Sequence, residues 1–271
     1  MVIIMNNFAT PQLYLLNRPT FDVEAFLAFL SRESLTWRRT QSATEAEEIV
    51  EAAGRICYMS FGANQSPRDN FEYIQNLIRM GHDSVLEHVS WTILITGVSR
   101  AFTHQLVRHR VGFAFSQLSQ QYHDERDAAF IMPTVLEGVP HAVQTWSDAM
   151  DSAKRAYEAI IVALQQSKSP VLTDLNKKET QRAIRSAARS VLPQATETKI
   201  IVTANARAVR HLLKTRGSIP GDLEMRQVCT ELLKVLRPEA PSLFFDFELQ
   251  TFSDEFPAVV QIPEEKLSLV S

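Results

Sequence analysis

The first feature of this sequence is how little cysteine it contains: Cys57 and Cys229 are the only two cysteines in 271 residues. Two cysteines cannot form a disulfide framework, and their distance in sequence does not match the close pairs of a zinc site. This scarcity is typical of proteins from a reducing cytoplasm. We therefore expect a cytoplasmic protein without a disulfide framework and without a metal site.

Long hydrophobic runs and a strong excess of charge are missing as well. No stretch approaches the roughly 20 apolar residues of a membrane-spanning helix, and the N-terminus lacks the basic segment and apolar run of a secretion signal. The formal net charge is −3 and the sequence pI is about 6.2, whereas domains that bind nucleic acid broadly are usually basic. The sequence predicts neither a membrane nor a nucleic-acid partner, but it allows a local basic pocket for a small anion.

Apolar periodicity predicts several helices and a strand in the first half of the chain. The expected helices are 20–31, a helix after a capping box at Ser42–Glu45, and a helix that begins at Ser66–Pro67 and ends near Gly81. Residues 89–95 alternate apolar and polar side chains and predict a strand. The buried face of the third helix is expected to consist of Phe71, Ile74, Leu77 and Ile78.

The same patterns continue through the rest of the chain. Ser99 can cap a helix that runs into residues 108–110, and a loop is expected over 111–122. The tail after Pro241 is expected to be apolar at first, then acidic and loose. Between this loop and the tail we expect helices at 140–167 and 180–191, a strand through 198–202, a helix from Asn205 to Arg216 and a last helix from Pro220 to Arg237.

No linker or internal repeat divides the chain. With 45% hydrophobic residues, it is long enough for one large core or two modest ones. We therefore expect a single α+β domain with a mixed sheet and a large helical part. In this division, residues 1–40 form an N-terminal extension, 41–240 the main domain and 241–271 a C-terminal tail.

The most informative segment is Arg108-His109-Arg110, which is followed by an uncharged run as far as Tyr122. Guanidinium groups match phosphate oxygens bidentately, so the segment indicates an anion site beside a polar loop that contacts the ligand. Taken alone, such a triplet is more often the solvated end of a helix, where cations are favourable.

Four ordered blocks resemble one family, the flavin-dependent thymidylate synthases, also called thymidylate synthase complementing proteins. Together they span roughly residues 45 to 237. The blocks are Gly81-His82-Asp83-Ser84 with Glu87-His88, Arg108-His109-Arg110 with Ser119 and Tyr122, Ala188-Arg189 with Leu192-Pro193, and Asn205-Ala206-Arg207 with Arg216 and Glu224-Met225-Arg226.

This sequence departs from the family pattern at three places. The run between Arg110 and Ser119 holds eight residues, one more than is usual in the family. Gln121 stands where the family usually has an Arg that helps to hold the nucleotide, and Asp222 where it commonly has Gln. Because Gln brings no charge, a charge-assisted contact to phosphate is lost at position 121.

The resemblance implies an enzyme that transfers a one-carbon unit from 5,10-methylenetetrahydrofolate to C5 of dUMP and reduces it to a methyl group, giving dTMP. FAD would be the cofactor and NADPH the source of the hydride. The resemblance also implies the family's fold and a homotetramer whose active sites are shared between subunits.

The same resemblance assigns the site residues. No Gly-x-Gly-x-x-Gly is present, so the flavin would not bind in the Rossmann manner. Nucleotide-contacting positions correspond to Gln105, Arg108, Gln117, Ser119, Gln121, Arg189 and Arg216. Flavin-contacting positions correspond to His82, Ser84, Arg108, His109, Arg110, Gln117, Asn205, Arg207 and His211.

Residue chemistry adds an expected mechanism. Both cysteines lie outside the motifs and are expected to be small core residues, which fits a reaction without an enzyme nucleophile. Cations near the pyrimidine carbonyls can stabilise an enolate-like anion, and we expect Arg216 to polarise the base and Arg189 to assist at a carbonyl. Ser119 is expected to be a hydroxyl ligand, with the backbone N–H groups around it cradling the phosphate.

Two alternatives stay open. The same chemistry could act on UMP or another pyrimidine nucleotide of secondary metabolism, because Gln121 and the longer loop alter the nucleotide-binding segment. The chain could also be a non-catalytic helical oligomer that binds a nucleotide or RNA through residues 108–110. The low pI argues against RNA, and the block from Asn205 to Arg216 would then have no purpose.

Overall fold

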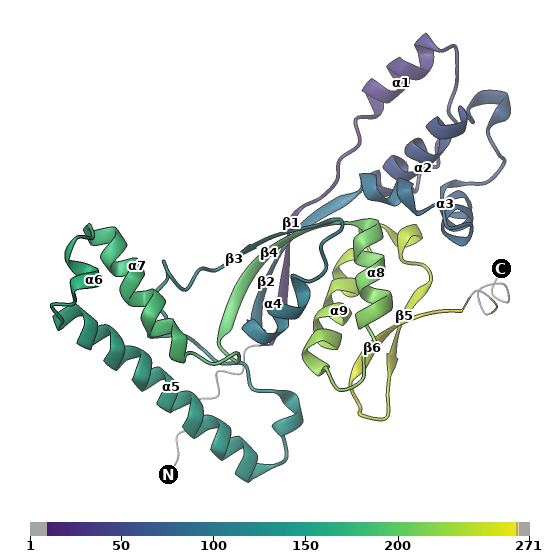
Figure 1. Cartoon of the computed structure of the whole chain (residues 1–271). Coiled ribbons are helices and arrows are strands. Elements are labelled where there is room, and N and C mark those ends of the chain that lie inside the picture. The colour runs from purple at the N-terminus through teal and green to yellow at the C-terminus, as the bar shows by residue number, and fades with distance from the viewer. Residues whose placement is uncertain (1–9, 264, 266–271) are drawn as a thin grey trace. The chain divides into compact units, whose positions relative to one another are not determined.

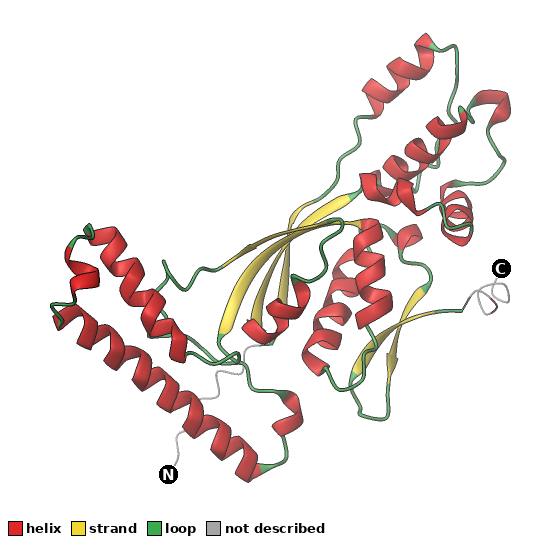
Figure 2. Cartoon of the chain, in the orientation of Figure 1, coloured by secondary structure: helices red, strands yellow, loops and turns green. Residues whose placement is uncertain are grey.

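The computed structural model describes residues 10–263 and residue 265, and its mixture of helices and strands confirms the predicted α+β class (Figures 1 and 2). The chain contains two compact units. Unit 1 comprises residues 10–12, 95–108 and 116–201, and unit 2 comprises 13–94, 109–115, 202–263 and 265. The predicted loose ends fall partly on residues outside the described ones, and the predicted boundaries at 40 and 240 remain predictions.

The main sheet has four strands in the order β1-β2-β4-β3. Two of its strands confirm the alternation in the sequence, because Trp91, Ile93 and Ile95 of β2 and Ile200 of β4 are buried. Asn205 ends β4 and then caps the next helix, as expected. The strands are β1 (Gln12–Asn17), β2 (Ser90–Ser99), β3 (Phe113–Gln117) and β4 (Glu197–Asn205).

Strand β3 was not predicted, since the sequence was expected to form a loop over residues 111–122. Its side chains do alternate, with Phe113 and Phe115 less exposed than Ala114 and Ser116. The two phenylalanine rings stack with centroids 5.6 Å apart. Five residues are too short a run for periodicity to separate a strand from a polar loop, and the loop expectation is wrong here.

The helices of unit 1 follow the predicted starts closely. Ser99 Oγ accepts a hydrogen bond from Phe102 N and caps α4, and Pro140 opens the long helix α5. However, α4 ends at Leu106, so the triplet at 108–110 lies beyond the helix and does not close it. The elements are α4 (Arg100–Leu106), η3 (Thr134–Leu136), α5 (Pro140–Gln166), α6 (Pro170–Thr173), α7 (Lys177–Ala188) and η4 (Arg189–Val191).

A small hydrophobic core joins α5 to α7 within unit 1, where the two helices lie side by side (Figure 1). Tyr157 and Ile161 of α5 pack with Ile184 and Ala188 of α7. Because Arg189 immediately follows Ala188, this core fixes the end of α7 from which Arg189 extends.

The N-terminal helices of unit 2 begin later than the sequence suggested. The capping box of α2 uses Thr44 with Glu47, and that of α3 uses Asp69 with Glu72. Neither Ser42 nor Ser66 is an N-cap, because a second capping sequence lies a few residues downstream in each case. The elements are α1 (Val23–Arg32), α2 (Glu45–Tyr58), η1 (Gly62–Asn64), α3 (Asn70–Arg79) and η2 (Asp83–His88).

The expected buried face of α3 is correct only in part. Ile74 and Leu77 are buried, Ile78 is half-buried, and Phe71 is 43% exposed. Tyr73 is buried instead, beneath the guanidinium of Arg55 at 4.3 Å from the ring centre. The helix had been expected to start earlier, and its observed start gives the core-facing positions to Asn70, Tyr73, Ile74 and Leu77.

The C-terminal part of unit 2 is a helical pair with a β-hairpin (Figure 2). Helix α9 begins after Asp222, whose side chain accepts from Met225 N, so Pro220 does not open it. The tail after Pro241 was expected to become loose, but β5 and β6 pair antiparallel, with Leu249 opposite Val259. The elements are α8 (Ala206–Arg216), α9 (Leu223–Leu236), η5 (Pro241–Leu243), β5 (Phe247–Thr251) and β6 (Pro257–Gln261).

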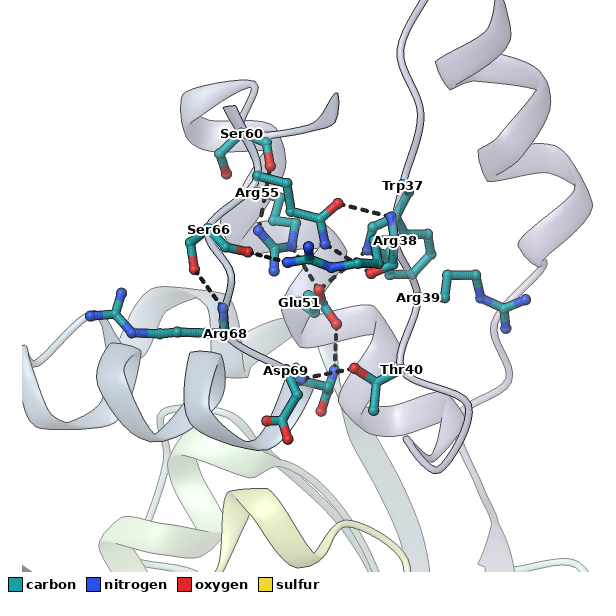
Figure 3. Close-up of polar contacts among 12 residues, drawn as sticks. Trp37, Arg38, Arg39, Thr40, Glu51, Arg55, Ser60, Ser66, Arg68 and Asp69 are labelled. Atoms are coloured by element: carbon teal, nitrogen blue, oxygen red, sulfur yellow. Dashed lines mark hydrogen bonds and ion pairs between the residues drawn. The ribbon is translucent and has the colours of Figure 1, made fainter. Parts of the chain in front are cut away.

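A buried ion pair lies at the centre of the N-terminal part of unit 2 (Figure 3). Arg55 Nε donates to Glu51 Oε1 at 2.6 Å, and both side chains are at most 1% exposed. Glu51 also accepts from Trp37 Nε1 at 3.2 Å and from Asn70 Nδ2 at 2.7 Å. The buried guanidinium is therefore neutralised by a carboxylate that accepts two further hydrogen bonds, while Arg55 Nη2 has no hydrogen-bond partner among the described residues.

Candidate functional site

Unit 1 contains a pocket of about 400 Å³ whose wall carries cationic and neutral polar side chains but no carboxylate. Arg100 comes from the first turn of α4, and Arg189, a residue predicted from the sequence, comes from the end of α7. The pocket is lined by Arg100, His104, Gln120, Ser186, Arg189, Ser190, Leu192, Pro193 and Gln194. Its chemistry suits a small anion.

The two arginines of this pocket repel each other. The pKa of the Arg100 guanidinium is lowered, first by burial and also by Arg189, while Glu125 acts in the opposite direction. The Arg189 guanidinium forms no hydrogen bond or ion pair with any residue that the structure describes. Because a guanidinium stays protonated, a bound anion would relieve this repulsion.

Gln120 gives a second reason to place a ligand in the pocket. The residue is 6% exposed, and its Nε2 has no hydrogen-bond partner among the described residues. A buried donor without an acceptor costs on the order of 1–3 kcal/mol. Arg100 Nη1 lies 3.5 Å from the oxygen of Leu118, in the same segment. A ligand oxygen in the pocket would satisfy the Gln120 donor.

Arg100 and Gln120 were not predicted from the sequence. A signal for Arg100 exists, because a cation at the start of a helix is opposed by the helix dipole and therefore calls for another explanation. Gln120 carries no comparable signal, since it is one of several amide side chains in an uncharged run.

The segment after β3 folds into a turn around Ser119. Ser119 O accepts from the N–H groups of Tyr122 and His123, and Ser119 Oγ accepts from Gln121 N at 3.3 Å. These three N–H groups donate within the turn, and the phosphate cradle expected around Ser119 stays a prediction. No acid or imidazole side chain hydrogen-bonds to Ser119 Oγ in the described part of the chain, and the ligand role expected for this hydroxyl stays a prediction.

The other predicted nucleotide-contacting residues of unit 1 lie on α4, on β3 and just beyond them. Gln117 Nε2 donates to Thr103 Oγ1 at 3.0 Å and to Thr198 Oγ1 at 3.2 Å. Its amide nitrogen is thus engaged, and its oxygen is the atom with which it can meet a donor. Gln105 is half-buried and hydrogen-bonded or otherwise engaged, whereas Arg108 is exposed.

Unit 2 brings together the predicted flavin-contacting residues of η2 and α8. Arg207 Nη1 pairs with Glu87 Oε1 at 2.6 Å, and both side chains are about half exposed. Ser84 lies in η2 and is exposed, and His82 precedes η2 and is half-buried. An exposed pair of this kind contributes only about 0–1 kcal/mol, so Arg207 can exchange Glu87 for another anion at little cost.

Gly112 packs the start of β3 against the beginning of α8. Its backbone adopts φ +75°, and its oxygen accepts from Asn205 N at 3.1 Å. A Cβ at this position would lie 2.8 Å from both Asn205 side-chain atoms and from Ala208 Cβ. Any larger residue would therefore displace Asn205, whose Oδ1 caps α8 by accepting from Ala208 N.

His109 lies at the junction of these residues. Its ring centre is 6.3 Å from that of His211 and 6.1 Å from that of Phe113. Burial lowers its pKa, and Arg216 and His211 lower it further. Its Nε2 is buried without a hydrogen-bond partner among the described residues. The site therefore holds a neutral imidazole with an unused ring nitrogen, near the exposed Arg110.

Comparison with known proteins identifies the family of this chain. Residues 40–242 match the model of the family described as thymidylate synthase complementing protein. The chain belongs to this family. It is 38% identical over 231 residues to the flavin-dependent thymidylate synthase of Corynebacterium aurimucosum, covering 85% of this chain and 91% of that protein.

Two further relatives agree. The flavin-dependent thymidylate synthase of Mycolicibacterium vanbaalenii is 41% identical over 207 residues, which are 76% of this chain and 81% of that protein. That of Mycobacterium tuberculosis is 39% identical over 227 residues, or 83% and 88% of the two chains. This member of the flavin-dependent thymidylate synthase family is thus an enzyme of the methyltransferase class, as the sequence blocks predicted.

The two cysteines of this family member differ in their surroundings. Cys57 is exposed, so the expectation of a core residue is wrong for it, because α2 turns Glu51, Gly54 and Arg55 into the core and leaves Cys57 outside. Cys229 is buried, and burial raises the pKa of its thiol to about 12. A thiol with such a pKa stays protonated at neutral pH and is a poor nucleophile.

Two findings about the described residues complete the site. No cluster of three or more His, Cys, Asp or Glu side chains could hold a metal ion within this part of the chain. No helix in the same residues combines the length and the hydrophobicity needed to span a lipid bilayer.

Proposed function

We propose that this protein catalyses the reductive methylation of dUMP at C5 with 5,10-methylenetetrahydrofolate, giving dTMP, with FAD as cofactor and NADPH as hydride source. The observation that carries the proposal is the carboxylate-free pocket of unit 1, where Arg100 and Arg189 lie without a neutralising partner in the pocket wall. The names of the relatives, flavin-dependent thymidylate synthases, support the reaction and the flavin.

In this proposal the pocket of unit 1 binds the nucleotide. Arg100 and the Gln120 amide meet the phosphate, because both lie at the segment that carries Ser119. Ser119 and Gln121 contribute a hydroxyl and an amide, and Gln117 offers its amide oxygen to a donor of the nucleotide. Gln105 and Arg108 complete the set of contacts.

Activation of the pyrimidine is electrostatic in this account. Arg216 and Arg189 stabilise negative charge that develops on the carbonyl oxygens when C5 becomes nucleophilic, and they act as fixed charges because a guanidinium is not a base at neutral pH. Cys229 cannot attack C6, since its thiol is protonated and buried. No enzyme nucleophile is required.

The residues of unit 2 fit a flavin dinucleotide. His109 Nε2 is a buried ring nitrogen without a hydrogen-bond partner among the described residues. The tight contact of Gly112 with Asn205 holds the Asn205 side chain at the start of α8. Arg110 and Arg207 supply cations for the pyrophosphate, and His82, Ser84 and His211 supply further polar contacts. A flavin held by these residues would supply the hydride that reduces the one-carbon unit.

We propose that the protein works in the cytoplasm as a homotetramer with active sites shared between subunits. The expectation comes from the family resemblance, and light scattering of the purified protein at assay concentration measures the mass. A monomer that is fully active would contradict it.

A mass-spectrometric product assay tests the function. Purified protein receives FAD, NADPH and methylenetetrahydrofolate, with dUMP and UMP in parallel reactions, and the nucleotides are analysed for a gain of one methyl group. We expect methylated dUMP and unmodified UMP. Methylation of UMP in preference to dUMP would contradict the proposed substrate, and no methylation of either nucleotide would contradict the reaction.

A further inference from the structure

The β5–β6 hairpin lies outside residues 40–242, the part that matches the family model, yet it packs against α8 and α9 (Figure 1). Ala258 and Val259 of β6 are buried. A peripheral tail would not need such burial. The hairpin contacts the rest of unit 2 at three points: its open end, its turn and its middle.

Arg210 of α8 holds the open end. Its guanidinium pairs with Asp246 through two hydrogen bonds, Nη1 to Oδ1 at 2.6 Å and Nη2 to Oδ2 at 2.7 Å. Asp246 Oδ2 also accepts from Gln261 Nε2 at 2.8 Å, which ties the ends of both strands to the same carboxylate. The Arg210 guanidinium covers the ring of Phe247 at 5.1 Å.

Arg226 of α9 holds the turn. Its guanidinium is 1% exposed, pairs with the carboxylate of Asp254 and donates through Nη2 to the oxygen of Phe256 at 2.7 Å. It also covers the ring of Phe252 at 5.1 Å. Arg226 belongs to one of the four sequence blocks, and its contacts here are to the hairpin.

The middle of the hairpin contacts the residue that follows Arg216. Val259 N donates to Gly217 O at 2.9 Å. A Cβ on Gly217 would lie 2.4 Å from Leu213 O in α8, 2.7 Å from Val259 Cβ and 2.8 Å from Val259 O. Gly217 has φ −60° and ψ −27°, which any residue adopts. The glycine is therefore required by two close approaches, to the last turn of α8 through Leu213 O and to β6 through Val259.

We propose that the C-terminal hairpin is a positioning element for Arg216, with Val259 and Gly217 as its point of action and Arg226 with Asp254 as its anchor. The inference rests on the proposed role of Arg216 in activating the pyrimidine. Arg216 is the last residue of α8, and its guanidinium forms no hydrogen bond or ion pair with any described residue. Its location therefore depends on the backbone at 216–217, which the hairpin fixes.

The test compares Asp254→Asn with Glu255→Gln in the full-length, flavin-loaded protein. Both variants remove one negative charge from the same turn, but Asp254 contacts Arg226, whereas the Glu255 side chain forms no hydrogen bond or ion pair with the described residues. Hydrogen exchange of peptides covering 213–219 and 257–262 reports on the contact between Val259 and Gly217, because the second peptide contains the Val259 amide. We expect faster exchange in Asp254→Asn and unchanged exchange in Glu255→Gln.

A double-mutant cycle connects the hairpin to Arg216. Affinity for dUMP is measured by calorimetry, up to millimolar nucleotide, for both turn variants with Arg216 present and in the Arg216→Ala background. We expect Asp254→Asn to weaken dUMP binding about tenfold when Arg216 is present, since small displacements of a positioned group have effects of this size. In the Arg216→Ala background the two turn variants should bind dUMP equally.

Two results would overturn the proposal. One is faster exchange in Asp254→Asn with unchanged dUMP affinity, and the other is the same loss of affinity in the Arg216→Ala background, because the hairpin would then act through something other than Arg216. Flavin content is measured in each variant to distinguish a loss of fold from a specific loss of dUMP binding. If wild-type protein does not bind dUMP at all, the proposed function and the role of Arg216 fail, while the exchange rates still decide whether the hairpin fixes the helix end.

Discussion

Arginines in the two units have the same side chain and opposite surroundings. In unit 2, Arg55, Arg210 and Arg226 are buried, and each is paired with a carboxylate that accepts further hydrogen bonds (Figure 3 shows the first). In unit 1, Arg100 and Arg189 line one pocket that has no carboxylate in its wall.

The difference separates structural from ligand-binding cations. A buried pair is held because removing either partner leaves an uncompensated charge. Arg100 and Arg189 repel each other, and Glu125 offsets this repulsion at Arg100. We propose that the pocket binds an anion, because a bound anion would lower the remaining cost of placing two guanidinium groups together. The state of pairing, and not the residue type, tells the two kinds apart.

The largest expected effect follows from removing the carboxylate partner of a buried arginine in unit 2. Glu51→Ala leaves Arg55 buried at 0% exposure without a counter-charge, and we expect a loss of about 3–5 kcal/mol in the free energy of unfolding. Glu231→Ala, which removes one partner of the exposed pair with Lys234, should cost at most about 1 kcal/mol. Urea denaturation of both variants measures the difference, and equal losses would refute the distinction.

The next largest effect follows from removing an arginine of the pocket in unit 1. Arg189→Ala should lower kcat/KM for dUMP by about a hundredfold to a thousandfold, because a fixed charge at the developing anion is removed. The free energy of unfolding should change by less than about 0.5 kcal/mol, since Arg189 has no partner to lose among the described residues. Steady-state kinetics and denaturation of the same preparation check both parts. A variant that turns over normally, or one that is strongly destabilised, would contradict the assignment.

A smaller effect sharpens the comparison by adding a cation. Gln121 Nε2 makes only a long hydrogen bond, 3.4 Å, to Ser186 Oγ. Gln121→Arg restores the residue that is usual in the family, and we expect dUMP to bind about tenfold more tightly through a charge-assisted contact. Calorimetry at low and high salt measures this, because the gain should shrink as salt rises. Gln121→Leu is the uncharged control, and equal affinity of the Arg and Leu variants would speak against the contact.

The smallest effect concerns pH. Burial lowers the pKa of His109 below its ordinary value of 6.5, with Arg216 and His211 adding to the shift. The unfolded chain then binds the proton more readily, so stability is lost as the pH falls below about 6.5 and the loss levels off below the folded pKa. His109→Gln should flatten this part of the stability curve. Identical pH dependence in the variant and the wild type would show that another group is responsible.

Much of the fold could be predicted from the sequence because local patterns determine it. Trp91, Ile93 and Ile95 alternate on β2, and Ser99 and Asn205 cap the helices that they precede. Predictions failed where two similar signals lie close together, as with Ser42 and Thr44. They also failed where a strand such as β3 is too short for its periodicity to be distinctive.

The motif residues of the candidate site were named from the sequence and their roles stay predictions, whereas the charge balance of the pocket could not be predicted. The resemblance pointed to Arg189 and Arg216, whereas nothing local marks Gln120. Whether an arginine is paired depends on residues far away in the sequence. Arg210 of α8, for example, pairs with Asp246, which lies beyond α9 in the chain. Asp222, a departure from the family pattern, is explained by its position as the N-cap of α9.

The most direct test of the account compares dUMP with deoxyuridine as ligands. Calorimetric titration of both into the wild type and into Arg100→Gln isolates the contribution of the phosphate. We expect the wild type to prefer dUMP by about a hundredfold, as charge-assisted hydrogen bonds to a phosphate allow, and Arg100→Gln to lose most of that preference. A variant that keeps the full preference for dUMP would show that the unpaired arginine of this pocket does not bind the phosphate.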